Sequence, residues 1–256
     1  MAVAVAVAFV YASNRRTKRL QQELLRQMEQ GHKSEEKKTA FINSICHEVR
    51  TPLNSIAGFS ELLCTEEVSP EAHGQYCEII HESRRQLRYL FDDMLEVAQL
   101  ENLSEPLPRS YLDLCALCRS QLRAMKIRCP KIGLVYTDGI PAEQIAMVTS
   151  EKYLGILLAA LLGNAYKFTR QGEIRLECGR EGDERVYIAV TDSGCGIPPE
   201  KYDEVFERFT KLDPFSQGNG LGLYLCRLIV RHLGGEIRID PQYTEGTRVV
   251  VVLPRK

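Results

Sequence analysis

The sequence lacks a net charge of either sign. Its 256 residues carry 33 Lys and Arg against 34 Asp and Glu, which leaves a formal net charge of −1. A chain without a basic excess has no general attraction to nucleic acid or to an anionic membrane surface, so nucleic-acid binding is not expected. No internal repeat or low-complexity tract occurs, and the hydrophobic content of 44% is ordinary for a globular protein. The length fits one large domain or two smaller ones.

A disulfide framework is also missing, although the chain has nine cysteines. The one close pair, Cys115 and Cys118, has a spacing that suits one side of a helix. No second pair and no histidine cluster follows at zinc-ligand spacing, which disfavours a metal site here. An odd number of cysteines without a pattern indicates free thiols in a reducing cytoplasm.

The two commonest nucleotide-binding motifs are absent as well. The chain contains no G-x-x-x-x-G-K-S/T loop and no G-x-G-x-x-G turn. These absences exclude the commonest nucleotide-binding folds. Any nucleotide site must therefore be built from other residues.

The N-terminus has a short apolar run, MAVAVAVAFVYA, that is followed by the basic stretch SNRRTKR. A membrane-spanning helix needs about 20 apolar residues, so this run is too short to cross a bilayer alone. A signal peptide would carry its positive charge before the apolar run, whereas the inner end of a membrane helix carries it afterwards. We expect residues 1–16 to be either a truncated transmembrane end or an N-terminal extension. Residues 17–39 are expected to form a charged helical linker, which Gly31 weakens.

Residues 40–105 contain two segments with helical periodicity. In the first, apolar or small residues recur at steps of three and four: Ile42, Ile45, Val49, Leu53, Ile56, Ser60 and Leu63. The second segment has the same spacing: Tyr76, Ile80, Ser83, Leu87, Leu90, Met94 and Val97. Ser69 and Pro70 are placed as the cap and first residue of the second helix. The short connection predicts an antiparallel hairpin, and two such hairpins in a homodimer would bury both seams in a four-helix bundle.

Residues 106–256 are expected to form a second domain of the α+β class, in which a mixed sheet carries helices on one face. Helices are predicted over 114–128, 151–168 and 222–235, the last one ended by glycine. Strands are predicted at SYLDL and KIGLVYT, and hairpins at 173–192 and 236–254.

His47 lies in the stretch SICHEVRTPLNSI, inside the first predicted helix. It is two residues from both Ile45 and Val49, so it should point away from the seam and into solvent. Thr51 shares its face, and Pro52 should bend the helix beside it. Without other motifs, the favoured interpretation of His47 is an ordinary solvent-exposed histidine without a function. A neutral imidazole is nevertheless a competent nucleophile near pH 7, and the adjacent Glu48 could orient it and accept its proton.

Three further motifs have the chemistry to bind a nucleotide. In VTDSGCGIP, an aspartate at a strand end could accept a hydrogen bond from an exocyclic amine such as that of adenine, and glycines would let the backbone approach the ring. In QGNGLGLYLC, glycines precede a helix whose free N–H groups could cradle phosphate. In LLGNAYKFT, an amide oxygen and a cation share one helix side and suit Mg²⁺ and phosphate. Each motif alone also fits a plain turn, loop or polar helix face. The residues are Asp192, Gly194, Gly196, Gly218, Gly220, Gly222, Asn164 and Lys167.

Together, and in this order after a helical hairpin, the motifs resemble the catalytic core of two-component sensor histidine kinases. SICHEVRTPL matches the phosphoacceptor box, LLGNAYKFT the asparagine box and DSGCGIP the first glycine box. FERFTKLD matches the phenylalanine box and QGNGLGLYLC the second glycine box. The resemblance covers the chain from about residue 37 to the C-terminus, and the stretch before the second glycine box is similar to the lid of hybrid-type kinases of Bacteroidetes.

The resemblance implies a dimerisation and phosphotransfer bundle followed by a Bergerat-type ATP-binding domain. It implies that His47 attacks the γ-phosphoryl group of ATP while Glu48 acts as the base. Asn164 would hold Mg²⁺ and Lys167 would contact phosphate. Asp192 would bind adenine, Arg208 would reach the γ-phosphate, and the second glycine box would wrap the phosphates.

The resemblance also implies partners. The phosphoryl group would pass to an aspartate of a response-regulator receiver domain, and Thr51 fits a pattern that supports dephosphorylation of that partner. The chain would be the cytoplasmic portion of an inner-membrane sensor protein with an anchor upstream. Two departures bear on nucleotide affinity: Ala160 stands where many relatives have a second asparagine, and Gly246 is a single glycine where relatives often have two.

Two other functions compete with the kinase. A non-kinase ATPase of the same superfamily would not need the hairpin that carries His47. A catalytically weak dimeric module that acts on a receiver partner would not need Glu48, Asn164 and Asp192 together with the phosphate-loop glycines.

Overall fold

The computed structural model describes residues 39, 42–65, 68–212 and 220–256. The chain divides into two compact units, Met1–Thr51 and Pro52–Lys256. The proposed membrane end at residues 1–16 lies outside the described residues, as does the linker but for its last residue. Within the described ranges, no helix is both long and apolar enough to cross a bilayer.

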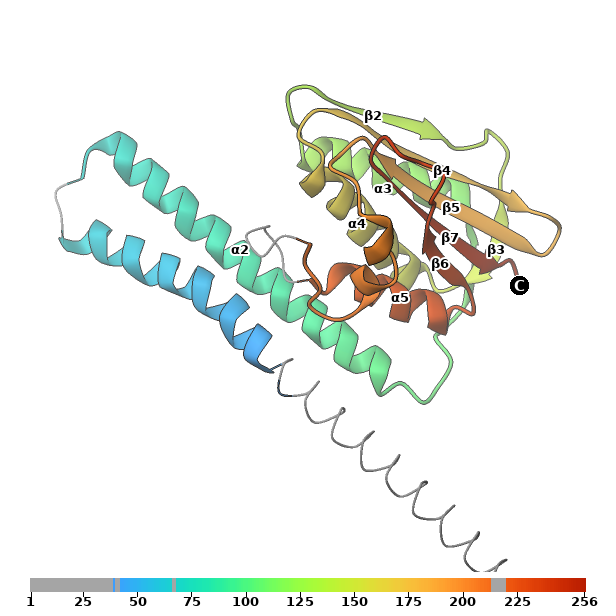
Figure 1. The fold of residues 1–256 in the computed structure, drawn as a ribbon, viewed down its shortest axis with the longest axis horizontal. Coiled ribbons are helices and arrows are strands. Elements are labelled where there is room, and N and C mark those ends of the chain that lie inside the picture. Colours follow the sequence, from blue (N-terminus) through green and yellow to red (C-terminus); the bar gives the residue numbers. More distant parts are fainter. Residues whose placement is uncertain (1–38, 40–41, 66–67, 213–219) are drawn as a thin grey trace, which may run out of the picture. The chain divides into compact units, whose positions relative to one another are not determined.

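The predicted helical hairpin is confirmed. Residues 42–65 form one helix, which continues through Pro52, and α2 covers Pro70–Glu101. The Ser69 hydroxyl accepts a hydrogen bond from the Ala72 N–H at 3.3 Å, and proline occupies the first turn, as the sequence indicates. Residues 52–65 run antiparallel to α2 (Figure 1), and the Phe59 and Tyr76 rings meet with their centroids 5.1 Å apart.

The two predicted seams fare differently. On α2 every seam residue is buried or half-buried, with Ser83, Leu90 and Val97 fully buried. On the first helix the seam residues Ile42 and Leu53 are 58% and 53% exposed, while Pro52 is buried. The seams were predicted for a homodimer, so the placement of these two residues stays a prediction.

The second domain has a five-stranded mixed sheet and a two-stranded sheet. The order in the large sheet is β2-β4-β5-β7-β6, with β2 parallel to β4 and all other pairs antiparallel. The small sheet pairs β1 with β3. The strand bounds are β1 Ser110–Asp113, β2 Leu134–Gly139, β3 Ala146–Thr149, β4 Gly172–Glu181, β5 Arg185–Asp192, β6 Glu236–Ile239 and β7 Thr247–Pro254.

Three helices cover one face of the large sheet, which confirms the predicted α+β architecture (Figure 1). They are α3 Leu114–Arg128, α4 Glu151–Phe168 and α5 Gly222–His232. Alternate residues of the three central strands enter one apolar core with these helices, as period-two strands require. The inward residues are Ile174, Leu176, Cys178, Val186, Ile188, Val190, Val249, Val251 and Leu253.

Three elements differ from the sequence expectation. β2 begins at Leu134 rather than at the start of KIGLVYT, α5 ends at His232 rather than at residue 235, and β3 was not expected. A four-residue strand is too short to show a period. β3 exists because its neighbours supply partners: Asp113 pairs with Ala146, and the Val148 N–H donates to the Arg255 carbonyl at 3.0 Å.

Truncation of the α4 core should destabilise the domain strongly. Leu157 is 0% exposed at the centre of the helical layer, so Leu157→Ala should lower the free energy of unfolding by about 2–5 kcal/mol, as buried leucines do. Ile132→Ala is the matched control, because Ile132 is 99% exposed and its loss should cost less than about 0.5 kcal/mol. Urea unfolding of both variants followed by circular dichroism measures the difference, and equal stabilities would contradict this assignment of the core.

Candidate functional site

His47 lies on the surface of the first helix, as predicted. Its side chain is 77% exposed, and its Nδ1 is 4.0 Å from Oε1 of the half-buried Glu48. The Thr51 hydroxyl donates to the His47 backbone carbonyl at 3.4 Å. An exposed imidazole with a carboxylate beside one ring nitrogen leaves its other nitrogen open to solvent and to an electrophile. All three residues belong to the unit Met1–Thr51.

Asp192 is a buried carboxylate at the last position of β5. Its Oδ1 accepts a hydrogen bond from the Gly194 N–H at 2.9 Å. Burial raises the pKa of this carboxyl group above its usual value, while the N–H groups of Gly194 and Thr247 oppose that shift. The nearby Thr169 hydroxyl also lowers this pKa, although it makes no hydrogen bond of good geometry within the described part of the chain. A polar ligand that bound here would gain a strong acceptor.

The backbone closes tightly around Asp192, which explains why this site uses glycine. A Cβ placed on Gly246 would lie 2.0 Å from the Asp192 carbonyl oxygen. No side chain fits at that separation, so Gly246 is required for the strands to meet here. The glycine in the TEGT stretch could have indicated this close approach of the backbone, but neither Gly246 nor Thr247 was among the predicted site residues.

Asn164 and the N-terminus of α5 come together. The Asn164 amide atoms lie within 3.5–3.6 Å of the position that a Gly222 Cβ would take, at the first residue of α5. The Leu221 side chain makes no capping hydrogen bond to α5, so an anion at this N-terminus would meet the positive end of the helix dipole. Lys167, one turn after Asn164, has its Nζ 4.3 Å from the centroid of the Phe168 ring. The structure therefore brings an amide, a cation and a helix N-terminus to one end of the helical layer.

The phenylalanine box is attached to the second glycine box through the backbone. The Phe209 N–H donates to the Gly220 carbonyl at 2.9 Å. Gly220 has a φ of 65°, and a Cβ on it would lie 2.7 Å from the Phe209 backbone, so only glycine fits this turn. Arg208 is thereby held next to the turn that leads into α5. The remaining predicted glycine of this box, Gly218, lies outside the described residues.

Arg208 contacts two residues that were not predicted from the sequence. Its guanidinium pairs with the Glu101 carboxylate and lies 5.0 Å from the centroid of the Tyr224 ring. The Tyr224 hydroxyl donates to the same Glu101 oxygen. No motif marks Glu101, since it is one of several acidic residues near the end of a helix, and only the folded chain shows its role.

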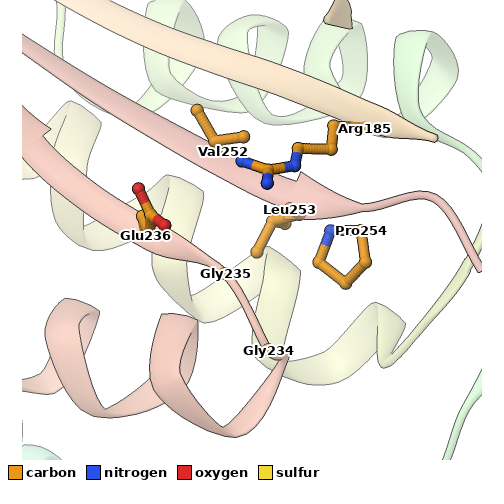
Figure 2. A pocket seen from close by; sticks show the side chains of 7 residues that line it. All are labelled: Arg185, Gly234, Gly235, Glu236, Val252, Leu253 and Pro254. Atoms are coloured by element: carbon orange, nitrogen blue, oxygen red, sulfur yellow. The ribbon is translucent and has the colours of Figure 1, made fainter. Parts of the chain in front are cut away.

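A small pocket lies elsewhere on the sheet (Figure 2). It has a volume of about 120 Å³ and is lined by Arg185, Gly234, Gly235, Glu236, Val252, Leu253 and Pro254. In the strand register Arg185 pairs with Pro254, whereas Asp192 pairs with Thr247 at the other end of the same two strands. The pocket is therefore separate from the predicted nucleotide site. Among the residues with described placement, no group of three or more His, Cys, Asp or Glu is arranged to hold a metal ion.

Two family models match the chain. Residues 37–103 match the His Kinase A (phospho-acceptor) domain. Residues 149–256 match the histidine kinase-, DNA gyrase B- and HSP90-like ATPase.

Curated relatives agree with these matches. The histidine protein kinase DivJ of Caulobacter vibrioides is 30% identical over 219 residues, which is 84% of this chain and 37% of that protein. The sensor protein SrrB of Staphylococcus aureus is 27% identical over 237 residues, which is 90% of this chain and 40% of that protein. The chain thus spans about two fifths of the length of these relatives.

Solved structures share the fold. Full-length ShkA in complex with AMPPNP is 25% identical with a TM-score of 0.63, and the alignment covers 85% of this chain and 45% of that one. The histidine kinase ThkA in complex with the response regulator protein TrrA is 22% identical with a TM-score of 0.69, covering 86% and 61%. With a phospho-acceptor model on the hairpin and an ATPase model on the sheet domain, the chain belongs to the sensor histidine kinases and carries their catalytic core.

Proposed function

We propose that this chain is the ATP-dependent histidine kinase core of a two-component system, and that His47 is the residue phosphorylated. The observation that carries the proposal is the exposed imidazole beside a half-buried carboxylate, on the helix matched by the phospho-acceptor family. An Nδ1 that faces Glu48 leaves Nε2 as the attacking nitrogen. The new bond forms between Nε2 and the γ-phosphorus, the bond from that phosphorus to ADP breaks, and Glu48 accepts the imidazole proton.

ATP is the phosphoryl donor in this proposal, and the residues around Asp192 are its binding site. The fit is supported by a buried acceptor at a strand end and by backbone too close for any side chain but glycine. Asp192 would accept from the adenine amine, with Gly194 and Gly196 beside the ring. Lys167, Arg208 and the Gly218, Gly220 and Gly222 backbone would contact the phosphates.

Mg²⁺ is the metal that this chemistry uses, and it would neutralise charge on the phosphates. The Asn164 amide oxygen fits a hard cation, and its position against the first residue of α5 is where phosphates would lie. Mg²⁺ commonly takes only one or two protein ligands and completes its shell with phosphate and water, which suits a site with a single amide.

The proposed partners are a second copy of the chain and a receiver domain. Two hairpins would bury apolar side chains that one chain leaves exposed on α2, such as Phe91 at 50% and Leu95 at 61%. A response regulator would take the phosphoryl group from His47 onto an aspartate; the related ThkA has been crystallised in complex with such a protein. Thr51 would orient a water molecule that hydrolyses the aspartyl phosphate of this partner and releases inorganic phosphate. A membrane anchor upstream would place this core on the cytoplasmic side of an inner membrane.

The central test follows label from γ-labelled ATP. Wild-type protein incubated with Mg·ATP should acquire acid-labile label, because a phosphoramidate hydrolyses in acid. His47→Gln should lose this label completely, whereas His73→Gln should keep it, since His73 is an exposed histidine on α2 outside the proposed site. ATP hydrolysis without protein label, unchanged by His47→Gln, would instead identify a non-kinase ATPase. The absence of both label and hydrolysis would identify a module that works by binding.

Asn164→Ala should leave the dimer intact and lower the rate of phosphorylation by roughly 100-fold or more, because loss of groups that only orient metal ligands already costs about 10–100-fold. Light scattering measures the dimer, and labelling at several Mg²⁺ concentrations measures the loss. Gln121→Ala on α3 is the control for removal of a half-buried amide outside the proposed site. Full phosphorylation in Asn164→Ala would remove this residue from the metal role.

Nucleotide affinity should fall in mild acid through Asp192. Its pKa is raised by burial, and binding to the adenine amine needs the ionised form. The affinity for ADP should therefore be highest at neutral pH and should decline as the pH falls. Because the pKa of Asp192 is raised, this decline should begin at a higher pH than the pKa of about 4 of an ordinary aspartate would give. Calorimetric titrations across this range should show the decline in the wild type, and Asp192→Asn should bind weakly with no such dependence. A wild-type affinity unchanged down to about pH 4 would argue against the role.

A further inference from the structure

The guanidinium of Arg208 is held by a carboxylate on another element. Arg208 follows the 3₁₀ turn Glu204–Phe206 and pairs with Glu101, the last residue of α2. The Tyr224 hydroxyl, in the first turn of α5, donates to the same Oε1. The Arg208 guanidinium also lies over the Tyr224 ring. Glu101 thus accepts from two donors, and all three residues belong to the unit Pro52–Lys256.

The end of α2 is fixed to the helical layer by further contacts. The His232 Nε2 donates a hydrogen bond to the backbone carbonyl of the buried Leu100 at 2.7 Å. One turn earlier Glu96 pairs with Lys152 of α4 at 2.7 Å. The position of Glu101 is therefore set by α2 packing on α4 and α5, and it is not a chance contact of a free side chain.

This contact lies next to the proposed phosphate site. Phe209 follows Arg208 and donates to Gly220 at 2.9 Å, two residues before α5 begins. Arg208 reaches Glu101 through one terminal nitrogen of its guanidinium. The N–H groups of that nitrogen are then less available to a phosphate oxygen, and the carboxylate also repels a phosphate nearby. Glu101 and a terminal phosphoryl group are in that sense competing ligands.

We infer that Glu101 is a latch that withholds Arg208 from the terminal phosphoryl group of ATP until the end of α2 releases it. The inference rests on the proposed function, since it needs a nucleotide at the glycine turn. When the pair of Glu101 and Arg208 opens, Arg208 can contact the terminal phosphoryl group of a nucleoside triphosphate. A diphosphate lacks this group, so its affinity does not change. Glu101 therefore lowers the preference for triphosphate over diphosphate.

The latch also links α2 to the nucleotide site in both directions. α2 is one continuous helix of 32 residues that starts at the hairpin connection. A change that displaces its last turn would free Arg208, and by linkage a triphosphate that captures Arg208 must loosen that turn.

Glu101→Gln tests the inference through binding, without turnover. The amide keeps the size of the side chain but removes the charge that competes with phosphate. Titration calorimetry should give about three- to tenfold tighter binding of AMPPNP, the range for a partly exposed charged pair, with ADP affinity changed by less than about twofold. The double variant Glu101→Gln with Arg208→Gln should lose the gain.

Glu96→Gln is the matched control. It removes an ion pair between the same helix and the domain but leaves Arg208 and Glu101 in contact, so the ratio of AMPPNP to ADP affinity should stay at the wild-type value. A shift in both glutamine variants would show that looser packing of α2 is responsible, and would overturn the latch. An unchanged ratio in Glu101→Gln would overturn it as well.

Hydrogen exchange gives a second readout. In the wild type AMPPNP should speed the exchange of backbone amides near the end of α2, and ADP should not. Binding of both nucleotides with equal exchange would reject the latch and leave the proposed function standing. A wild type that bound neither nucleotide would reject the proposed function, and the latch with it.

Discussion

The close approach of backbone around Asp192 is the constraint on which the ATPase domain depends. β5 and β7 remain paired to the point where Asp192 meets Thr247, and Gly246 brings its backbone against the Asp192 carbonyl. The end of α4 reaches the same place, because a Cβ on Gly194 would lie 2.5 Å from the Phe168 carbonyl oxygen. Sheet and helical layer are thus joined at one buried carboxylate. The pKa of that carboxylate is raised because the junction excludes water.

A second junction connects the hairpin to this domain. α2 ends on α4 and α5 through Glu96, Leu100 and Glu101, each with a polar partner on the domain side. The ion pairs of Glu96 and Glu101 are individually weak where they are partly exposed. Val97 and Leu100 of the same helix end are buried in one apolar core with α4 and α5. The polar contacts can therefore change at a smaller cost than the apolar contacts beside them.

The proposed chemistry divides the work between two environments. His47 must stay in solvent to meet an electrophile, and its exposure follows from its distance in sequence to the seam residues. Asp192 must be dry to bind an amine selectively, and its burial follows from strand pairing. The two environments are not interchangeable. Exposure would weaken the hydrogen bond between Asp192 and the adenine amine, and burial would keep the His47 imidazole from reaching the phosphoryl group.

Much of this protein was determined by local sequence. Helix α3 runs over the predicted residues 114–128 and α4 over 151–168, because the apolar period is a short-range signal, and Asp113 caps the start of α3. The exposure of His47 and the strand-end position of Asp192 were also predictable, since both depend on helix or strand period. The roles carried by the motifs came from family resemblance and were not dictated by period or spacing.

Tertiary structure alone decided the rest. β3 exists only because β1 and the chain end supply hydrogen-bond partners, and in the single chain Pro52 is buried while Leu53 is exposed. The pairing of Glu101 with Arg208 joins residues 107 positions apart, and it also recruits Tyr224. The local sequence around each of these three residues does not predict the other two. Their contact depends on where the packed helices end, and this position produces no periodic pattern in the sequence.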